Sequence, residues 1–359
     1  MTRKELWLKR QKRRRMKKIR RFAVLGIAAF LVILTVILAF AGKHKGKPEE
    51  AAEAESETEE TAAADPEADT ADMIRLGDEA IGDVGWNLDD SGWWYKTEDN
   101  TQPVNGWKNL DGTRFYFDEN GYLMTGWHYL NDGSFACFSE SGLYMPDAQP
   151  KYAALTFDDG PSWQTGTILD VLEANNAKAT FFVVGTQAQG DETSRNNMIR
   201  AFNDGMEIGS HTWDHTTLLG KSADVIATVM QQNDDYLMQV LGTAPVLMRP
   251  TGGGVDDTVR ATVGKPMILW NVDTEDWATR DPASTVASAT TGIQDGSIIL
   301  MHDIYEETAE AVKTIVPELT NQGFRLVTVS ELAQIKGVTM QPGVSYGSFT
   351  EQALNPPAE

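Results

Sequence analysis

Cysteine is nearly absent from this sequence of 359 residues, in which Cys137 is the single thiol. One cysteine cannot form a disulfide within the chain or supply a metal site built on several thiolates. Basic residues are also scarce beyond the start: the net charge is −21, whereas residues 1–21 hold twelve Lys and Arg and one acid, about +11. The remainder therefore carries about −32, which argues against a nucleic-acid-binding protein because phosphate contacts need clustered Lys and Arg.

Charged residues are missing from residues 22–41, a mostly apolar stretch that is long enough as a helix to cross a hydrocarbon core of about 30 Å. The basic residues precede this stretch, so the positive-inside rule places residues 1–21 in the cytoplasm and the rest of the chain outside. We therefore expect a single-pass cell-membrane protein with a transmembrane anchor at residues 22–41. A cleaved signal peptide, with a shorter apolar core and a small-residue cleavage site, is the alternative.

Large apolar side chains are scarce from residue 48 to residue 83, where Glu, Asp, Ala and Thr predominate. Such a composition buries too little surface to order a chain, and its like charges favour an extended tether. We expect residues 42–83 to form an acidic disordered linker. A charged surface helix is the alternative, because Ala and Glu favour helix.

Aromatic residues recur in a short motif between residues 84 and 147. Gly-Trp pairs end at Trp86, Trp107 and Trp127, and Asp-Gly or Asn-Gly turn signals separate the aromatic runs, so we predict stacked β-hairpins. The segment resembles the cell-wall-binding repeats of choline-binding and glucan-binding proteins, which implies binding of teichoic-acid choline or of a glycan. Trp86, Trp94 and Trp107 are the candidates for an aromatic cage, and Trp127 is a further wall-binding candidate. A purely structural spacer is the alternative.

From residue 148 to residue 336 the pattern changes to alternating strands and helices, followed by a tail, residues 337–359, with no readable role. Seven apolar or β-branched runs are typical of strands, and helical segments lie between most of them. The pattern predicts an α/β domain with a distorted (β/α)7-type barrel, its closure inferred from strand number alone. The expected strands are 152–157, 179–184, 207–210, 246–249, 267–272, 297–302 and 325–329, and the expected helices include 165–175, 223–241 and 306–321.

Histidine is also rare, and three of the five histidines fall at predicted strand ends. His211 and His215, four residues apart, can bind one ion, and Asp159 can add an oxygen ligand, as in catalytic zinc sites that keep positions open for water and substrate. Asp158 can then act as a general base and His302 as a general acid. No activated serine or cysteine motif occurs, so the sequence favours direct attack by water, which a metal ion activates.

Five polar clusters therefore follow successive strands, at 156–161, 210–215, 249–254, 273–277 and 302–303. In this order they resemble the polysaccharide deacetylases of carbohydrate esterase family 4, which share the NodB homology domain, over about half of the chain. The resemblance implies a divalent ion, most often zinc, with cobalt, nickel or manganese as alternatives. It implies these roles: Asp159, His211 and His215 as metal ligands, Asp158 as base, His302 as acid, Arg249 orienting Asp158, Asp276 pairing with His302, and Gly252, Trp277 and Trp213 as substrate-binding residues.

One departure from the family pattern lies in the third cluster, where Gly252 replaces the usual aromatic residue. Glycine still supplies the backbone N–H that would stabilise an oxyanion, whereas the aromatic wall of the groove is lost.

The leading hypothesis is hydrolysis of N-acetyl groups of a cell-wall amino-sugar polysaccharide, with N-acetylglucosamine of peptidoglycan as the expected substrate. A glycosidase would use two carboxylates about 5–9.5 Å apart and no metal, and sensitivity to chelators separates these two readings. A third hypothesis is a non-catalytic wall-binding protein, which the metal content of the purified protein would distinguish.

Overall fold

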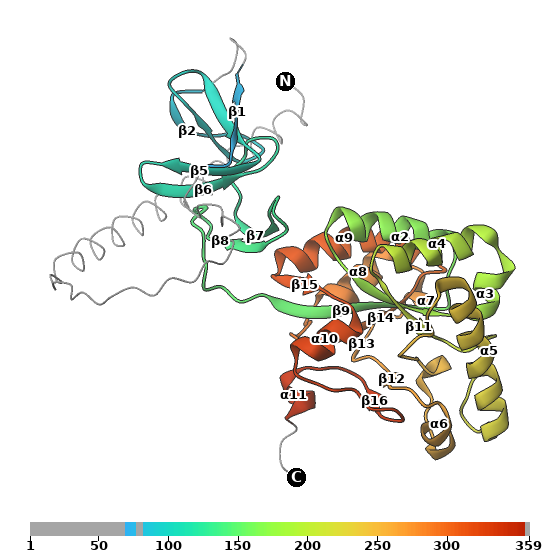
Figure 1. Ribbon diagram of the computed structural model, residues 1–359. Coiled ribbons are helices and arrows are strands. Elements are labelled where there is room, and N and C mark those ends of the chain that lie inside the picture. Colours follow the sequence, from blue (N-terminus) through green and yellow to red (C-terminus); the bar gives the residue numbers. More distant parts are fainter. Residues whose placement is uncertain (1–68, 77–81, 356–359) are drawn as a thin grey trace, which may run out of the picture. The chain divides into compact units, whose positions relative to one another are not determined.

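The computed structural model describes residues 69–76 and 82–355, which form a series of β-hairpins and an α/β domain (Figure 1). The predicted anchor at residues 22–41 and most of the predicted linker lie outside the described residues. Among the helices of residues 69–76 and 82–355, none combines the length and the apolar character that a membrane crossing requires.

Antiparallel hairpins form where the Gly-Trp motif recurs, as the sequence predicts. Each hairpin begins at the glycine of its Gly-Trp pair. A further antiparallel pair joins a strand that precedes the first hairpin to a strand between the first and second hairpins. The pairs are β2 (Gly85–Leu88) with β3 (Trp93–Lys96), β5 (Gly106–Leu110) with β6 (Thr113–Phe117), β7 (Gly126–Tyr129) with β8 (Phe135–Phe138), and β1 (Asp72–Arg75) with β4 (Thr101–Val104).

Aromatic rings pack both within a hairpin and between neighbouring hairpins. The ring of Trp86 lies 5.2 Å from that of Tyr95 on its own hairpin and 5.0 Å from that of Phe115 on the next. Trp107 repeats the first contact, 5.2 Å from Tyr116 across its strand pair. Single hairpins are marginal in water, so these shared rings account for the stacking.

A parallel sheet forms the centre of the α/β domain, with β9 (Lys151–Asp158) as its longest strand. The strand order is β11-β10-β9-β14-β13, and β15 pairs with the start of β9. Apart from β13 and β15, these strands lie within a residue or two of the predicted positions, and β15 ends three residues before the predicted strand at 325–329. Their bounds are β10 (Ala179–Val183), β11 (Glu207–Ser210), β13 (Val272–Asp273), β14 (Ser297–His302) and β15 (Phe324–Leu326).

Two other predicted strands, at 246–249 and 267–272, differ from the structure. The strand expected at 246–249 is a single bridging residue, Met248, because Pro245 and Pro250 flank it and lack the N–H that a ladder needs. The strand expected at 267–272 is split into β12 (Met267–Ile268) and β13. The split occurs where the side chain of Asn271, rather than a backbone carbonyl, accepts the hydrogen bond of Ile298 N–H at 2.8 Å.

The order of the strands is circular, as the predicted barrel requires, although its pairing is irregular. From β11 it runs through the bridges of Met248 to Met267 at the start of β12, and the same segment continues into β13, which pairs with β14. β16 (Ser345–Tyr346) pairs with β12 in addition. The result is a distorted barrel, in which one bridging residue and one split strand stand where two regular strands were predicted.

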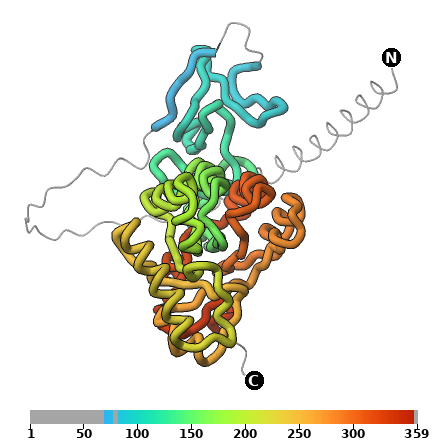
Figure 2. Tube along the Cα trace, turned by 90° about the vertical axis from the view of Figure 1, so that its right-hand side faces the viewer, coloured from blue at the N-terminus to red at the C-terminus, as the bar shows by residue number. Residues whose placement is uncertain are grey.

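The tail from residue 337 onward belongs to the domain core, which the sequence does not predict. Its strand β16 runs parallel to β12, and the two lie side by side in Figures 1 and 2. Phe349 is 1% exposed and packs with Tyr346 in the cluster around Ile298 and Val329. A segment for which the sequence predicts no element thus contains a strand that forms through tertiary pairing.

Helices pack on the sheet through apolar faces. In α9 the buried residues Val312, Ile315, Val316 and Leu319 recur at helical spacing and join the cluster that contains Leu155 of β9. Two predicted helices agree with the structure, and a third begins two residues earlier than expected. The longer helices are α2 (Trp163–Ala174), α4 (Glu192–Asn203), α5 (Ala223–Leu241), α8 (Pro282–Thr290) and α9 (Glu306–Asn321). The shorter helices are α3 (Gly185–Gly190), α6 (Asp257–Thr262), α7 (Asp276–Thr279), α10 (Val329–Ile335) and α11 (Glu351–Leu354), with a 3-10 turn at Thr251–Gly253.

Candidate active site and metal centre

The candidate residues gather at the carboxyl ends of the parallel strands. Asp158 ends β9, His211 directly follows β11, and His302 ends β14. Because β9 and β14 are parallel, their register places His302 opposite Asp158. The predicted clusters therefore meet at one edge of the sheet, as carboxyl ends do in α/β folds.

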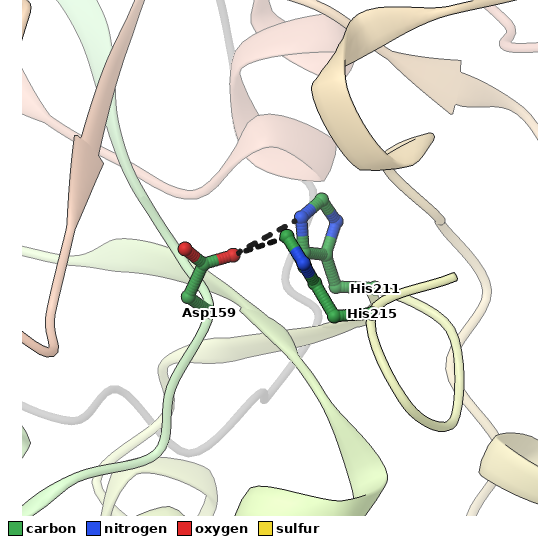
Figure 3. A group of neighbouring side chains, drawn as sticks. All are labelled: Asp159, His211 and His215. Carbon is green, nitrogen blue, oxygen red and sulfur yellow. Dashed lines mark ion pairs between the residues drawn. The ribbon is translucent and has the colours of Figure 1, made fainter. Parts of the chain in front are cut away.

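Asp159, His211 and His215 come together with their ligand atoms within 4.8 Å of one another (Figure 3). The Asp159 Oδ1 atom lies 2.9 Å from His215 Nε2 and 3.4 Å from His211 Nε2. Asp159 and His215 have φ angles of 73° and 62°, in the left-handed region. Each such residue costs about 1–2 kcal/mol, so the backbone is strained at two of the three side chains.

These three side chains fit a divalent metal ion. His211 Nδ1 lies 2.7 Å from the carbonyl oxygen of Arg249, so Nδ1 carries the proton that it donates there. Neutral His211 then presents the Nε2 lone pair to the buried Asp159 Oδ1, an arrangement that is repulsive unless a cation lies between the two atoms. Burial alone raises the pKa of Asp159, but positive charge beside the carboxylate, from the histidines when they are protonated or from an ion between them, holds the pKa below its usual range, so the carboxylate stays ionised.

Asp158 is held by a buried arginine. Its Oδ1 accepts a hydrogen bond from Arg249 Nη1 at 2.8 Å, and its Oδ2 lies 3.7 Å from His211 Nε2. Arg249 is fully buried, and Phe182 lies 4.3 Å from its guanidinium carbon. Its other hydrogen bonds go to Ile268 O and Leu269 O, each at 3.0 Å, and to Thr156 Oγ1 at 2.8 Å. The guanidinium is thus fixed on all sides and leaves only Asp158 Oδ2 available toward the ligands.

His302 is paired with a buried carboxylate. Its Nδ1 lies 2.8 Å from Asp276 Oδ1, and its backbone N–H donates to Asp276 Oδ2 at 2.8 Å. Thr308 Oγ1 and the Trp277 N–H complete the shell of Asp276, at 2.6 Å and 2.9 Å. Burial alone lowers the pKa of His302, but the hydrogen bond and charge of Asp276 outweigh it, so the pKa is raised and the ring favours its protonated form.

The three predicted substrate-binding residues have different surroundings. Trp277 is 53% exposed, at the start of α7 beside Asp276. Gly252 is exposed with φ 67°, and a Cβ added there would meet no atom within 4 Å. Trp213 instead packs against Gly185 and lies 5.7 Å from the Tyr236 ring, so its contacts are those of a packing residue.

Asp303 is a buried acid that the sequence analysis did not single out. It follows His302, is 1% exposed, and accepts a hydrogen bond at Oδ2 from Thr165 Oγ1 at 2.5 Å. Burial raises the pKa of Asp303 to about 7. A carboxylate directly after a candidate catalytic histidine, at the end of a buried strand, was the available signal.

The four tryptophans predicted to bind the wall are not equivalent. Trp94 is 9% exposed, and the guanidinium of Arg114 lies 4.5 Å from the Trp107 ring, so a cation already faces that ring. Trp127 stacks on Phe135 at 5.0 Å. Trp86 is 38% exposed, with its ring contacts to the hairpin aromatics described above. The cage expected from Trp86, Trp94 and Trp107 is therefore replaced by separate clusters.

Comparison with known proteins identifies relatives of the α/β domain that carries this site. Residues 146–265 match a family model described as polysaccharide deacetylase. The chain is 38% identical over 191 residues to the peptidoglycan-N-acetylmuramic acid deacetylase PdaC of Bacillus subtilis, a match that covers 53% of this chain and 40% of the relative. It is 34% identical over 195 residues to a peptidoglycan-N-acetylglucosamine deacetylase of Bacillus cereus, covering 52% of this chain and 90% of that one.

The fold of the α/β domain is also similar to that of a solved structure. A family 4 acetyl xylan esterase from Clostridium thermocellum, in complex with a cobalt ion, matches with a TM-score of 0.52 at 33% identity, covering 55% of this chain and 98% of that one. The chain spans less than half the length of the PdaC relative.

Proposed function

This chain belongs to the polysaccharide deacetylase family, and we propose that it is a metal-dependent hydrolase that removes N-acetyl groups from a cell-wall polysaccharide. One observation carries the proposal. Asp159, His211 and His215 cluster beside two separate charged pairs, Asp158 with Arg249 and His302 with Asp276. A ligand cluster, a base and an acid together are what amide hydrolysis by water requires.

The proposed substrate is N-acetylglucosamine of peptidoglycan. The relatives that support a peptidoglycan substrate are named for either N-acetylmuramic acid or N-acetylglucosamine. We choose the latter because a Bacillus cereus relative with this name is matched over 90% of its length, whereas the PdaC relative is matched over 40% of its length.

Asp159, His211 and His215 would hold the ion, for which we propose zinc. When bound, the ion lowers the pKa of water and polarises the scissile carbonyl. Cobalt in the xylan esterase structure supports a divalent ion at a site of this kind.

The side chains then divide the proton transfers. Asp158 Oδ2 takes a proton from the attacking water while Arg249 holds Oδ1. The water oxygen bonds to the acetyl carbon, and the backbone N–H of Gly252 is the proposed donor to the oxyanion. As the C–N bond breaks, His302 gives its Nε2 proton to the leaving amine, because Asp276 holds the Nδ1 side. The products are acetate and a free amino sugar.

An assay of acetate release tests the proposal. The full chain with bound zinc should release acetate from peptidoglycan, and Asp158→Asn and His211→Ala should reduce the rate by about 10²-fold or more. A panel with chitooligosaccharides and acetylxylan identifies the preferred glycan. Absence of release by the wild type contradicts the proposal. Release that a chelator and both substitutions leave unchanged also contradicts it, and favours a metal-independent enzyme.

We also propose that residues 22–41 anchor the chain in the cell membrane and that the hairpins bind the wall, through choline or a glycan. Trp86 supports the second proposal, because it combines exposure with the neighbouring rings of Tyr95 and Phe115. Trp86→Ala should weaken co-sedimentation with purified cell walls, whereas Trp127→Phe, which keeps an aromatic ring to stack on Phe135, serves as the control. Equal binding by wild type and Trp86→Ala would leave the hairpins as a spacer.

A further inference from the structure

Asp303 is joined to the start of α2 by its side chain and by its backbone. Thr165 Oγ1 donates to Asp303 Oδ2 at 2.5 Å, and Ser162 Oγ donates to the Asp303 carbonyl oxygen, also at 2.5 Å. Both hydroxyls belong to the capping box of α2, in which the Ser162 N–H donates to Thr165 Oγ1 at 2.8 Å. Both hydroxyl groups of this helix cap therefore donate to the same residue, Asp303, which directly follows β14.

The surroundings of the Asp303 carboxyl are apolar and tight. Asp303 and Thr165 line a gap with Phe181, Met198 and Ile208 that is too small for a water molecule. Asp303 Oδ1 has no hydrogen-bond partner in the described structure. Burying a carboxyl in this way is unfavourable, and a helix cap does not require it, since Ser162 and Thr165 satisfy the helix N-terminus by themselves.

The joined elements are the two sides of the proposed active site. Ser162 lies three residues after Asp159, and Asp303 is the residue after His302. Gly160, which lies between Asp159 and Ser162 in the sequence, packs directly on the Asp303 carboxyl: a Cβ at Gly160 would lie 2.2 Å from Asp303 Oδ1. The end of β9 and the loop that follows it, which carry Asp158 and Asp159, thus have little freedom to move relative to the end of β14.

We infer that Asp303 is a positioning residue: with Ser162 and Thr165 it forms a lock that holds the base and the metal ligand of the β9 loop at a fixed place relative to His302. The inference rests on the proposed function, because these positions matter only if Asp158, Asp159 and His302 act together. A displacement of about 1 Å in such a group can reduce turnover about 10²-fold. Loosening the lock should therefore lower kcat more than it raises KM.

Thr165→Val tests the lock, because it keeps the shape of the side chain and removes the hydroxyl. In the full chain loaded with zinc we expect kcat to fall about 10–100-fold with KM changed by less than about twofold. Thr165→Ser, which restores the hydroxyl, should recover most of kcat. Ser194→Ala is the matched control, since it removes a hydroxyl bond to a capping carboxylate, 2.8 Å from Asp191, at the start of α4.

Zinc affinity, measured by competition with a chromophoric chelator, is a second readout that does not depend on turnover. Thr165→Val should weaken zinc binding about tenfold, because Asp159 follows the loosened loop. If Thr165→Val does not fold, Ser162→Ala replaces it in both assays, with smaller changes of the same sign. Wild-type kcat and zinc affinity in the folded variant, no recovery by Thr165→Ser, or an equal loss in Ser194→Ala each overturn the lock. A wild type that binds zinc but releases no acetate instead removes the proposed function, and the zinc measurements alone then decide the lock.

Discussion

Substitution of Asp276 by asparagine probes the proposed acid most directly. The Asp276 carboxylate is the acceptor in all four of its hydrogen bonds, and the donors are His302 Nδ1, the His302 N–H, Thr308 Oγ1 and the Trp277 N–H. Asparagine offers one acceptor oxygen and one NH₂ donor, so two of the four bonds lose their acceptor. At about 1–3 kcal/mol for each unsatisfied buried group, stability should fall by about 2–6 kcal/mol. A domain with about 5–15 kcal/mol of stability can survive that loss.

The effect on activity has a definite sign along the pH axis. Burial favours neutral His302, and Asp276 raises its pKa above the ordinary 6.5 despite that burial. Asp276→Asn removes the raising charge, so the alkaline limb of kcat/KM should move to lower pH, and kcat should fall by about 10²–10⁴-fold, the range of a general acid. The stability that protonated His302 gains from the pair is complete below pH 6.5 and is lost as the pH rises through the raised pKa. The stability difference between wild type and variant should shrink in that direction.

Acetate release measured from about pH 5 to pH 10, with denaturant unfolding at the ends of the range, checks both effects. Asp281→Asn is the matched control, because Asp281 is an exposed cap of α8 that accepts from Ser284 N–H at 2.9 Å. An alkaline limb at the wild-type pH, or a kcat reduced no more than in the control, would refute the assignment of His302 as the acid held by Asp276.

Three further predictions concern the ion, the arginine and the third cluster. Removing the ion with a chelator should abolish acetate release and lower Tm in calorimetry, since a ligand at 1,000 times its Kd stabilises by about 4 kcal/mol. Arg249→Met should cost about 3–5 kcal/mol in denaturant unfolding by leaving the Asp158 charge unpaired, and Arg249→Lys should recover part of it; equal stability in all three proteins contradicts the pair. Gly252→Ala should lower stability by about 1–2 kcal/mol because of its φ of 67°. It should keep kcat, since the backbone N–H remains. A large loss of kcat would contradict the idea that Gly252 contributes only its backbone N–H.

Periodicity predicted the elements that are regular by themselves. Strands 207–210 and 297–302 and helices 223–241 and 306–321 agree with the structure at both ends. In each, the spacing of the apolar residues along the sequence matches the face that the element buries. The strand at 246–249 failed because the prolines beside it reduce it to Met248 alone. β16 was missed because a two-residue strand exists only through its pairing with β12.

The candidate site was predictable as a set of residues, and the family resemblance implied the pairs of Asp158 with Arg249 and of Asp276 with His302, but local sequence spacing gave neither contact. His302 and Asp276 are 26 positions apart, and only the fold brings the imidazole and the carboxylate within 2.8 Å. Local spacing likewise gave no reason to separate Trp94, which is buried, from the more exposed Trp86. The lock at Asp303 needed both strand ends in place before it could be recognised.

Arg249 has a consequence for how this protein loads its ion. Its carbonyl oxygen fixes the ring of His211, while its guanidinium fixes Asp158, so one residue touches a ligand and the base. Arg249 therefore gives occupancy of the metal site and placement of the base a direct route by which to influence each other, and such a coupling has the same free energy in both directions. An apo chain is therefore expected to differ from the loaded chain in the arrangement of its base as well as in the missing ion.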